Sequence, residues 1–316
     1  MQQLFIGGCE RSGTTMLGAQ LGSHSQCLCI PEALFWVETL QHWEGDLQNI
    51  DPLKVIRKIE IHPRFKIWGL NLDTSVWDKS SSPTTYAELI EWIVLQYGNK
   101  HQKPAPSLWV DQTPSNMKYA ATLFSIFPRA KMIHLVRDGR AVVSSIMALG
   151  WFGSVDRATY YWLEKLSHGL AAESLYGPER ILRVRYEDLV SSPEETLRSL
   201  CKFMEIEYQP RMVNGDGLDL PVFAQRTHAL VGQSPIKSRI NAWETELTTR
   251  EVEIFENIAG DMLTFLGYTP KYGARARELK DTERVASFLN YIRSIGNFYY
   301  NRYRVYWYGY IKRKPK

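Results

Sequence analysis

The segment that most constrains the fold is a short apolar run near the N-terminus, followed by a loop bounded by glycines. Residues 4–8 read LFIGG and predict a buried strand, and residues 14–21 predict the helix that follows. Between them, Gly8 and Gly13 have the spacing of a P-loop. Backbone N–H groups and the positive end of a helix dipole converge at such a loop, so it predicts an anion site at the end of a parallel strand.

The loop departs from the P-loop pattern in its cation. That pattern continues with Lys and then Ser or Thr after the second glycine, where the lysine reaches the β- and γ-phosphates. Here Thr14 and Thr15 follow Gly13, and the cation stands earlier, at Arg11. This indicates a nucleotide with no γ-phosphate to hold, which argues against a P-loop kinase as the alternative enzyme class. The alternative to an anion site is a glycine-rich turn that only connects a strand to a helix and binds nothing.

A second segment ends another predicted strand with an arginine. Residues 131–136 read KMIHLV, Arg137 follows them, and the helix predicted over 141–149 carries Ser144 and Ser145. Open α/β sheets bind ligands at the carboxyl ends of their parallel strands. An arginine there, with a serine nearby, can bind a second phosphate through charge-assisted and neutral hydrogen bonds. A surface Arg-Asp pair with solvated serines is the alternative that this segment alone leaves open.

Together the two segments resemble the sulfotransferases that use 3′-phosphoadenylyl sulfate. The loop 10–15 (ERSGTT) resembles their 5′-phosphosulfate loop, and Arg137 with Ser145 resembles their 3′-phosphate motif. The run 135–147 (LVRDGRAVVSSIM) is especially similar to the tyrosylprotein-type and bacterial members, and the resemblance covers most of the chain. It implies in-line sulfuryl transfer to an acceptor hydroxyl, without a covalent enzyme intermediate or a required metal. The donor-binding residues that it implies in these segments are Arg11, Ser12, Gly13, Thr14, Thr15, Arg137 and Ser145.

The resemblance also implies a general base, which sulfuryl transfer uses to activate the acceptor hydroxyl. In similar enzymes a glutamate stands about one helix and one loop after the phosphate loop, and Glu32 is the matching residue here. The alternative is that Pro31-Glu32 only opens a helix with a favourable dipole contact. His24 is the rival base, because cytosolic relatives use histidine, although residues 22–25 (GSHS) read as a turn that ends a helix.

A second role for Arg11 and two further residues complete the expected site. Arg11 is the catalytic cation, which neutralises charge on the departing phosphate. Tyr186 is the last residue of a predicted strand, in the run RYEDL, which matches a family segment whose tyrosine can line the nucleotide site. Core packing explains it nearly as well. Similar enzymes fold a basic loop over the nucleotide, and the run 234–239 (SPIKSR) assigns Arg239 to that loop, with a solvated basic loop as the alternative.

Gln112 departs from the family pattern. Similar enzymes often carry Lys just before a Thr-Pro or Asp-Pro pair, where it stabilises the sulfuryl group, whereas Gln112 precedes the Thr-Pro pair at 113–114. Its amide can donate a hydrogen bond but brings no charge. Either Arg11 suffices, or Lys118 or Lys237 substitutes, or activity is low. The departure motivates the non-enzyme alternative, a nucleotide-binding scaffold.

The remaining pattern predicts an α/β fold of one domain over 1–284, with a P-loop-type parallel sheet and helices on both faces. Capping patterns begin two helices, after Ser192 and Thr248. Residues 46–85 read as an insertion over the sheet, and residues 215–235 as a long loop. Helical stretches separate the runs that predict strands, which indicates βα units: 4–8, 108–111, 131–136 and 181–186.

Composition limits the compartment. The four cysteines show no zinc spacing, and the N-terminus reaches the phosphate loop within eight residues and carries no basic leader. We therefore expect a reduced, cytoplasmic chain. No apolar run reaches the ~18 residues of a membrane-spanning helix.

The tail, residues 285–316, differs from the rest of the chain. It holds ten aromatic residues and seven Lys or Arg but no acid. Subtracting these seven charges from the net charge of +4 leaves the rest of the chain near −3. We therefore expect no nucleic-acid-binding domain. Aromatic and basic residues suit peripheral contact with an anionic membrane; they equally suit stacking on sugars or packing as a terminal helix.

The acceptor predicted with such a tail is a carbohydrate or lipid-linked saccharide. A peptide tyrosine or a small natural-product hydroxyl is the alternative. The sequence leaves the oligomeric state open.

Overall fold

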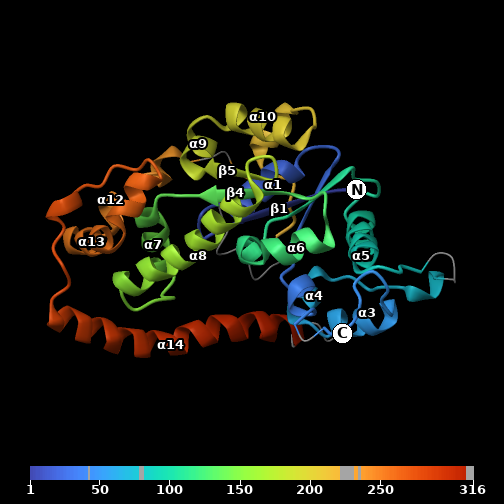
Figure 1. Cartoon of the computed structure of the whole chain (residues 1–316), viewed down its shortest axis with the longest axis horizontal. Helices are drawn as coiled ribbons and strands as arrows, with labels where there is room; N and C mark the ends of the chain where they lie inside the picture. The colour runs from blue at the N-terminus through green and yellow to red at the C-terminus, as the bar shows by residue number, and fades with distance from the viewer. Residues whose placement is uncertain (42, 78–81, 221–230, 234–235, 311–316) are drawn as a thin grey trace.

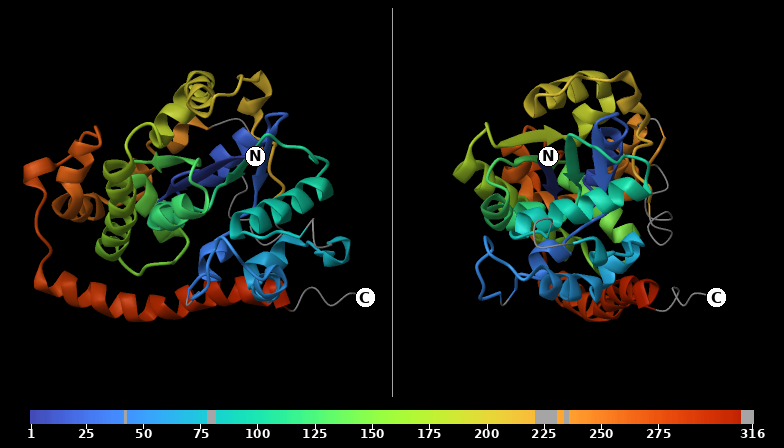
Figure 2. Two further views of the ribbon diagram at one scale, coloured as in Figure 1. Left: turned by 45° about the vertical axis from the view of Figure 1, so that its right-hand side comes forward. Right: turned by 90° about the vertical axis from the view of Figure 1, so that its right-hand side faces the viewer.

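Helices surround one five-stranded sheet in the computed structural model of the chain (Figures 1 and 2). The structure describes residues 1–41, 43–77, 82–220, 231–233 and 236–310. Every pairing in the sheet is parallel, in the spatial order β2-β3-β1-β4-β5. The strands are β1 (Gln2–Gly8), β2 (Cys27–Ile30), β3 (Leu108–Asp111), β4 (Lys131–Val136) and β5 (Ile181–Arg185). The predicted α/β class with a parallel sheet is confirmed.

Helices pack on both faces of the sheet because side chains alternate along each strand. Phe5 of β1 belongs to one core, whereas its neighbours Leu4 and Ile6 belong to another. The first core joins the sheet to α2 (Phe35–Glu38), α3 (Pro52–Glu60), α4 (Pro63–Trp68), α5 (Tyr86–Lys100) and α6 (Ala120–Ile126). The second joins it to α1 (Thr14–Gly22), α9 (Tyr186–Ser191) and α10 (Pro193–Met204).

A third core closes the end of the molecule beyond β4. Trp162 and Phe255 pack there with their ring centres 5.5 Å apart. The helices that build it are α7 (Gly139–Ala148), α8 (Val155–Tyr176), α12 (Trp243–Glu246) and α13 (Thr249–Phe265). The short 3₁₀ segments are η1 (Thr74–Val76), η2 (Pro114–Tyr119), η3 (Pro210–Asn214), η4 (Lys237–Arg239) and η5 (Gly273–Arg275).

Three strands differ from the sequence prediction. The predicted strand 4–8 begins two residues late, because β1 starts at Gln2. The strand β2 was not predicted, because a run of four residues is too short to show the alternation of side chains that marks a strand. The strand forms because its backbone pairs with β3. The predicted strand 181–186 is one residue too long. Tyr186 is instead the first residue of α9, which turns its ring toward the phosphate loop, close to Gly13.

The two predicted helix caps behave differently. Thr248 forms a complete capping box with Glu251 at the start of α13. Ser192 stands before α10 as predicted, but its side chain caps none of the backbone groups that the structure describes. The Ser192 carbonyl instead accepts from the Thr196 hydroxyl at 2.9 Å.

The predicted insertion packs over the sheet. Trp68 of α4 is buried, and its ring centre lies 5.3 Å from that of Trp36. Trp36 in turn contacts Trp109 of β3, so the insertion shares the core of the sheet. Part of the predicted loop 215–235, residues 221–230 and 234–235, lies outside the described residues.

The C-terminal helix α14 (Asp281–Tyr310) runs along the lower edge of Figure 1 and reaches α4. It begins before the predicted tail boundary at residue 285 and continues as one helix to Tyr310, the last described residue. Within the described part of the chain, no helix is both long enough and apolar enough to span a membrane.

Candidate active site

One cavity of about 210 Å³ lies where β1 and β4 end. The sheet order makes this edge the natural binding place, because the chain turns to opposite sides of β1 there. All the predicted site residues except Ser12 line it: Arg11, Gly13, Thr14, Thr15, Glu32, Arg137, Ser145, Tyr186 and Arg239. The remaining lining residues were not singled out from the sequence: Glu10, Met16, Pro114, Trp151 and Val231.

The loop between β1 and α1 has a backbone that an ordinary turn would not need. Gly13 precedes α1 at φ 101°, and a Cβ there would lie 2.7 Å from the Tyr186 ring, so glycine is required twice over. Arg11 has φ 71°, a conformation that costs free energy for a residue with a side chain. Ser12 is buried, and its N–H donates to the Cys9 carbonyl at 3.1 Å. Ser12 therefore shapes the turn from behind the cavity.

Arg137 ties three parts of the site together. Its guanidinium donates to the Arg11 carbonyl at 2.8 Å and to the Arg239 carbonyl at 2.9 Å. It lies 4.2 Å from the centre of the Tyr186 ring, which fits a cation–π contact. Arg11 donates in turn from Nε to the Ser145 hydroxyl at 3.1 Å. Two motifs that lie far apart in the sequence thus meet through direct contacts.

The cavity concentrates positive charge. Burial and the nearby guanidinium groups of Arg137 and Arg239 lower the pKa of Arg11. Burial likewise lowers the pKa of Arg137, and Arg239 adds to the effect. The Nε of Arg137 is buried and meets no hydrogen-bond acceptor among the described residues. A ligand with separate anionic groups would satisfy this donor and reduce the repulsion between the arginines.

Glu32 lies just past the end of β2, so it reaches the same edge of the sheet as the phosphate loop. Its carboxylate forms an ion pair with Arg64 of α4, and both side chains are about one-third exposed. Burial by itself would lower the pKa of Arg64, but the charge of Glu32 and the hydrogen bond to it outweigh burial and raise that pKa. Sequence reasoning missed Arg64, because no local pattern shows that α4 folds back over Glu32.

His24 does not reach the cavity. It precedes β2, at the end of that strand opposite to Glu32. Its Nε2 lies 2.9 Å from the Glu207 carbonyl, and its Nδ1 accepts from the Gln26 N–H at 3.1 Å. The ring is buried, and burial lowers its pKa. The structure therefore gives His24 a role in the turn before β2, whereas Glu32 lines the cavity.

Gln112 and the two substitute lysines lie away from the cavity lining. Gln112 is buried and accepts from the Thr15 hydroxyl at 3.1 Å, so it braces the first turn of α1. Lys118 lies over the Tyr119 ring, and Lys237 is exposed in η4. The cations that do line the cavity are Arg11, Arg137 and Arg239.

Two of the unpredicted lining residues are polar or aromatic, Glu10 and Trp151. Glu10 lines the cavity next to Arg11, and burial together with the charge of Glu10 raises the pKa of Tyr161 in α8. Trp151 projects from the loop between α7 and α8. A glutamate within the phosphate loop was visible in the sequence, but nothing local distinguished Trp151 from the other tryptophans.

Comparisons with known proteins agree with this geometry. A family model described as "Sulfotransferase family" matches residues 3–210. The protein-tyrosine sulfotransferase of Drosophila melanogaster is 27% identical over 288 residues, which cover 85% of this chain and 52% of that protein. The human protein-tyrosine sulfotransferase 1 is 28% identical over 285 residues, covering 85% and 70%. The chain thus spans about half the length of the fly relative.

Solved structures show the same fold. The sulfotransferase domain from the Synechococcus PCC 7002 olefin synthase superposes with a TM-score of 0.57 at 20% identity, covering 84% of this chain and 94% of that one. The sulfotransferase domain from the curacin biosynthetic pathway gives 0.51 at 20% identity, covering 84% and 98%.

Proposed function

Because the chain belongs to the sulfotransferase family, we propose that it transfers a sulfuryl group from 3′-phosphoadenylyl sulfate to an acceptor hydroxyl. The observation that carries this proposal is the convergence of Arg11, Arg137 and Arg239 on one cavity beside a P-loop-like turn. The donor has two anionic ends. The turn suits the 5′-phosphosulfate through its N–H groups, and Arg137 with Ser145 suits the 3′-phosphate.

The proposed reaction is one in-line displacement. Glu32 accepts the proton of the acceptor hydroxyl as the acceptor oxygen forms a bond to sulfur. The bond from sulfur to the bridging oxygen breaks, and its electron pair leaves on the 5′-phosphate of adenosine 3′,5′-bisphosphate. Arg11 and the N–H groups of the turn stabilise the negative charge that grows on that phosphate.

Arg64 has a positioning role in this scheme. It pairs with the Glu32 carboxylate and holds that side chain in place at the cavity. Both side chains are partly exposed, so the Glu32 carboxylate is open to an approaching acceptor hydroxyl although it is paired with Arg64. Arg64 does not line the donor cavity, and its loss should affect turnover more than donor binding.

The acceptor that the relatives favour is a tyrosine hydroxyl in a peptide. Relatives such as those of fly and human are named protein-tyrosine sulfotransferases, which moves this acceptor ahead of the saccharide that the tail suggested. The mouth of the cavity is consistent with an aromatic acceptor, because Trp151, Met16 and Pro114 offer it apolar surface.

The experiment supplies donor labelled in its sulfuryl group and three acceptors. These are a tyrosine peptide, the same peptide with phenylalanine in place of tyrosine, and an oligosaccharide. Label on the tyrosine peptide alone is the expected result, and label on the oligosaccharide alone would keep the donor but overturn the acceptor. Binding of adenosine 3′,5′-bisphosphate with no labelled product would favour the scaffold, and no binding would refute the proposal.

A further inference from the structure

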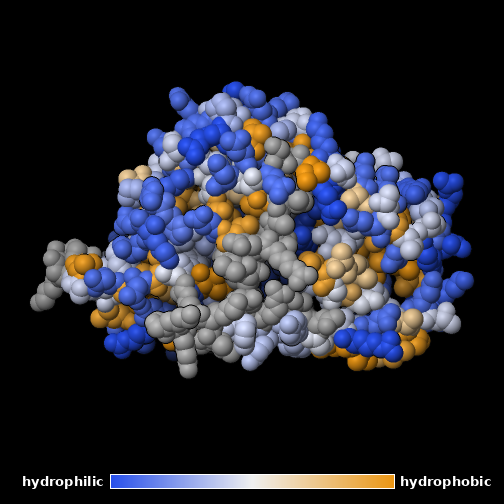
Figure 3. Space-filling view, turned by 180° about the vertical axis from the view of Figure 1, so that it is seen from behind, coloured by the Kyte–Doolittle hydropathy of each residue, from blue (hydrophilic) through white to orange (hydrophobic). Residues whose placement is uncertain are grey.

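The helix α14 turns an apolar face away from the protein. At about 100° per residue, Phe288, Ile292 and Tyr299 share one stripe, with Val285 and Tyr303 beside it. All five side chains are at least half exposed, and Leu289 and Trp307 widen the stripe. Apolar residues also show along part of the lower edge of the molecule when it is seen from behind (Figure 3). A helix that only stabilised the fold would bury this stripe.

The opposite face of α14, which packs on the protein, is polar and small. Ser287 and Ser294 are buried there. The Ser287 hydroxyl donates to the Asp156 carboxylate at 2.6 Å and lies 2.9 Å from the Ser154 hydroxyl. A Cβ on Gly153 would lie 2.2 Å from the Asn290 carbonyl, so the two backbones approach closely. These specific contacts define which face points outward.

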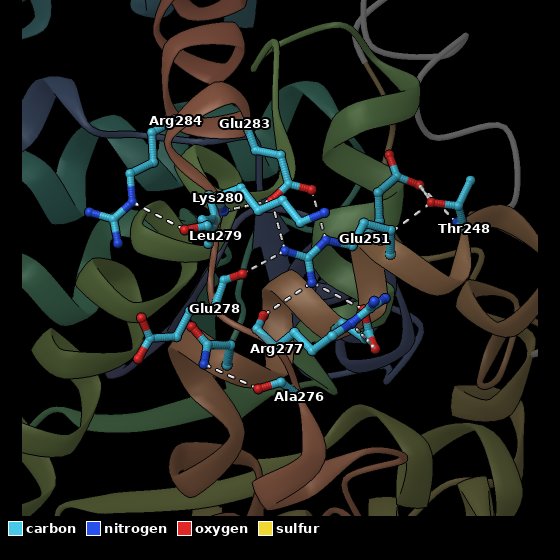
Figure 4. A network of polar contacts seen from close by, with 12 residues as sticks. Thr248, Glu251, Ala276, Arg277, Glu278, Leu279, Lys280, Glu283 and Arg284 are labelled. Carbon is cyan, nitrogen blue, oxygen red and sulfur yellow. Dashed lines mark hydrogen bonds and ion pairs between the residues drawn. The ribbon is translucent and has the colours of Figure 1, made fainter.

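A charge network fixes the start of the same helix (Figure 4). Arg250 of α13 donates to both oxygens of Glu283, at 2.9 and 2.7 Å, and the Lys280 N–H donates to Glu283 at 2.8 Å. Arg250 also pairs with Glu253, which in turn binds Arg277. The far end of α14 packs on α4. With both ends held, the helix cannot simply roll its apolar stripe inward.

We propose that α14 is an interfacial helix that attaches this protein to the surface of an anionic membrane. Contiguous apolar surface rimmed by polar residues marks an interaction site. Arg284 and Arg293 are exposed and lie roughly 90° to either side of the stripe, where cations reach lipid headgroups while the stripe enters the acyl boundary. Tyrosine and tryptophan on the stripe suit that boundary, since they are apolar with a polar end.

The charge of the tail favours lipid over a second copy of the chain. The exposed Arg284 and Arg293 flank the stripe, so two copies that met along it would bring like charges together. The sequence of residues 285–316 adds only cations, seven Lys or Arg and no acid. An anionic surface attracts the same charges by about 1 kcal/mol for each cation close to it.

Attachment would also set the position of the catalytic cavity. The helix α14 packs on α4, which carries Arg64, and on the start of α8, next to the loop that carries Trp151. Trp151 lines the cavity, and Arg64 pairs with Glu32, which also lines it. The cavity would therefore work close to the lipid surface. The attachment itself does not depend on the proposed reaction.

The test is sedimentation of the chain of residues 1–316 with vesicles of phosphatidylcholine, with and without about one-third phosphatidylserine. We expect binding to the anionic vesicles alone, weakening as salt rises from about 0.05 M to 0.5 M because screening shortens the reach of the charges. The variant Phe288→Ser/Leu289→Ser/Ile292→Ser removes three half-exposed apolar side chains. It should bind at least ~10-fold more weakly, since each side chain loses its transfer into lipid.

The matched control is Leu175→Ser/Phe265→Ser, which removes exposed apolar side chains from α8 and α13. It should sediment like the unchanged protein, and thermal melts of both variants should match that protein, because none of these side chains is in a core. Failure of the unchanged protein to bind anionic vesicles at low salt would refute the proposal. Equal loss of binding in both variants would also refute it. A dimer in solution that only the α14 variant dissociates would show that a second copy covers the stripe.

Discussion

At the scale of single residues, Arg137 does more than contact a ligand. It donates to the carbonyls of Arg11 and Arg239, so it also sets the positions of two segments of the site. Arg137→Ala should therefore weaken binding of adenosine 3′,5′-bisphosphate more than Ser145→Ala does. Hydrogen bonds to charged groups contribute ~1.5–3 kcal/mol, against ~1 kcal/mol for neutral ones.

Calorimetry measures both variants with this nucleotide and with its analogue that lacks the 3′-phosphate. Arg137→Lys is the informative companion, because a lysine cannot reach both carbonyls in the same fork geometry, and it should behave like the alanine variant. Equal affinity of the unchanged protein for the two nucleotides would contradict the assignment of Arg137 and Ser145.

Glu32 is the second residue whose role the geometry makes testable. Glu32→Gln should leave nucleotide affinity nearly intact and lower turnover by ~10²–10⁴-fold, the usual contribution of a general base. Arg64→Ala should also spare nucleotide affinity, with a smaller loss of turnover, because it releases the carboxylate without removing it. Glu44→Gln, on an exposed loop, is the control for the chemistry of the substitution. Near-normal turnover of Glu32→Gln would leave the reaction without this base.

At the scale of elements, the two caps provide a matched pair of substitutions. Thr248→Ala removes the capping box of α13 and should lower the free energy of unfolding by ~1 kcal/mol. Ser192→Ala changes the same kind of position before α10, where the side chain makes no cap to a described backbone group, and should cost far less. Chemical denaturation of the two variants checks the difference. Equal losses would mean that Ser192 caps α10 in solution.

The ion pairs between Glu173 of α8 and the sheet should make the free energy of unfolding depend on pH. Burial alone would raise the pKa of Glu173, but hydrogen bonds from His134 of β4 and Arg183 of β5 outweigh it and lower that pKa to about 2. A carboxyl whose pKa is lowered on folding stabilises the fold above its unfolded value, 4.5, and this contribution disappears as the pH falls toward 2. The free energy of unfolding should therefore decrease through that window.

Glu173→Gln tests the assignment. By linkage, Glu173 accounts for up to about 3 kcal/mol of the decrease. Denaturation curves between pH 5 and pH 2.5 should be flatter for the variant than for the unchanged protein. Parallel curves for the two proteins would place the acid sensitivity elsewhere.

At the scale of the whole molecule, the cavity and α14 are built from separate elements. Removing residues 285–316 should leave the affinity for adenosine 3′,5′-bisphosphate within about twofold, because the cavity is built from β1, β4 and the segments that follow them. The contacts of Ser287 with α8 are lost with the helix, but hydrogen bonds that water can replace contribute little net free energy. Calorimetry on the shortened chain measures this, and a large loss of affinity would show that α14 supports the cavity.

Much of the fold and of the donor side was predictable because its signals are local. Gly8, Gly13 and Arg11 lie within one turn, and Arg137 directly follows the apolar run that became β4. A parallel sheet brings the carboxyl ends of its strands to one edge, so two such motifs meet there whatever the rest of the chain does. The strand β2 escaped prediction because four residues carry too little pattern, and its place depends on pairing with β3.

The tertiary structure alone decided how distant segments meet. It paired Glu32 with Arg64, turned His24 away from the cavity and placed Gln112 behind the loop. It also decided which face of α14 points outward. Composition showed that the tail is basic and aromatic, but only the contacts of Ser287 show that its polar face packs on the protein. Local patterns determine elements, whereas the partner of a side chain depends on where remote elements come to lie.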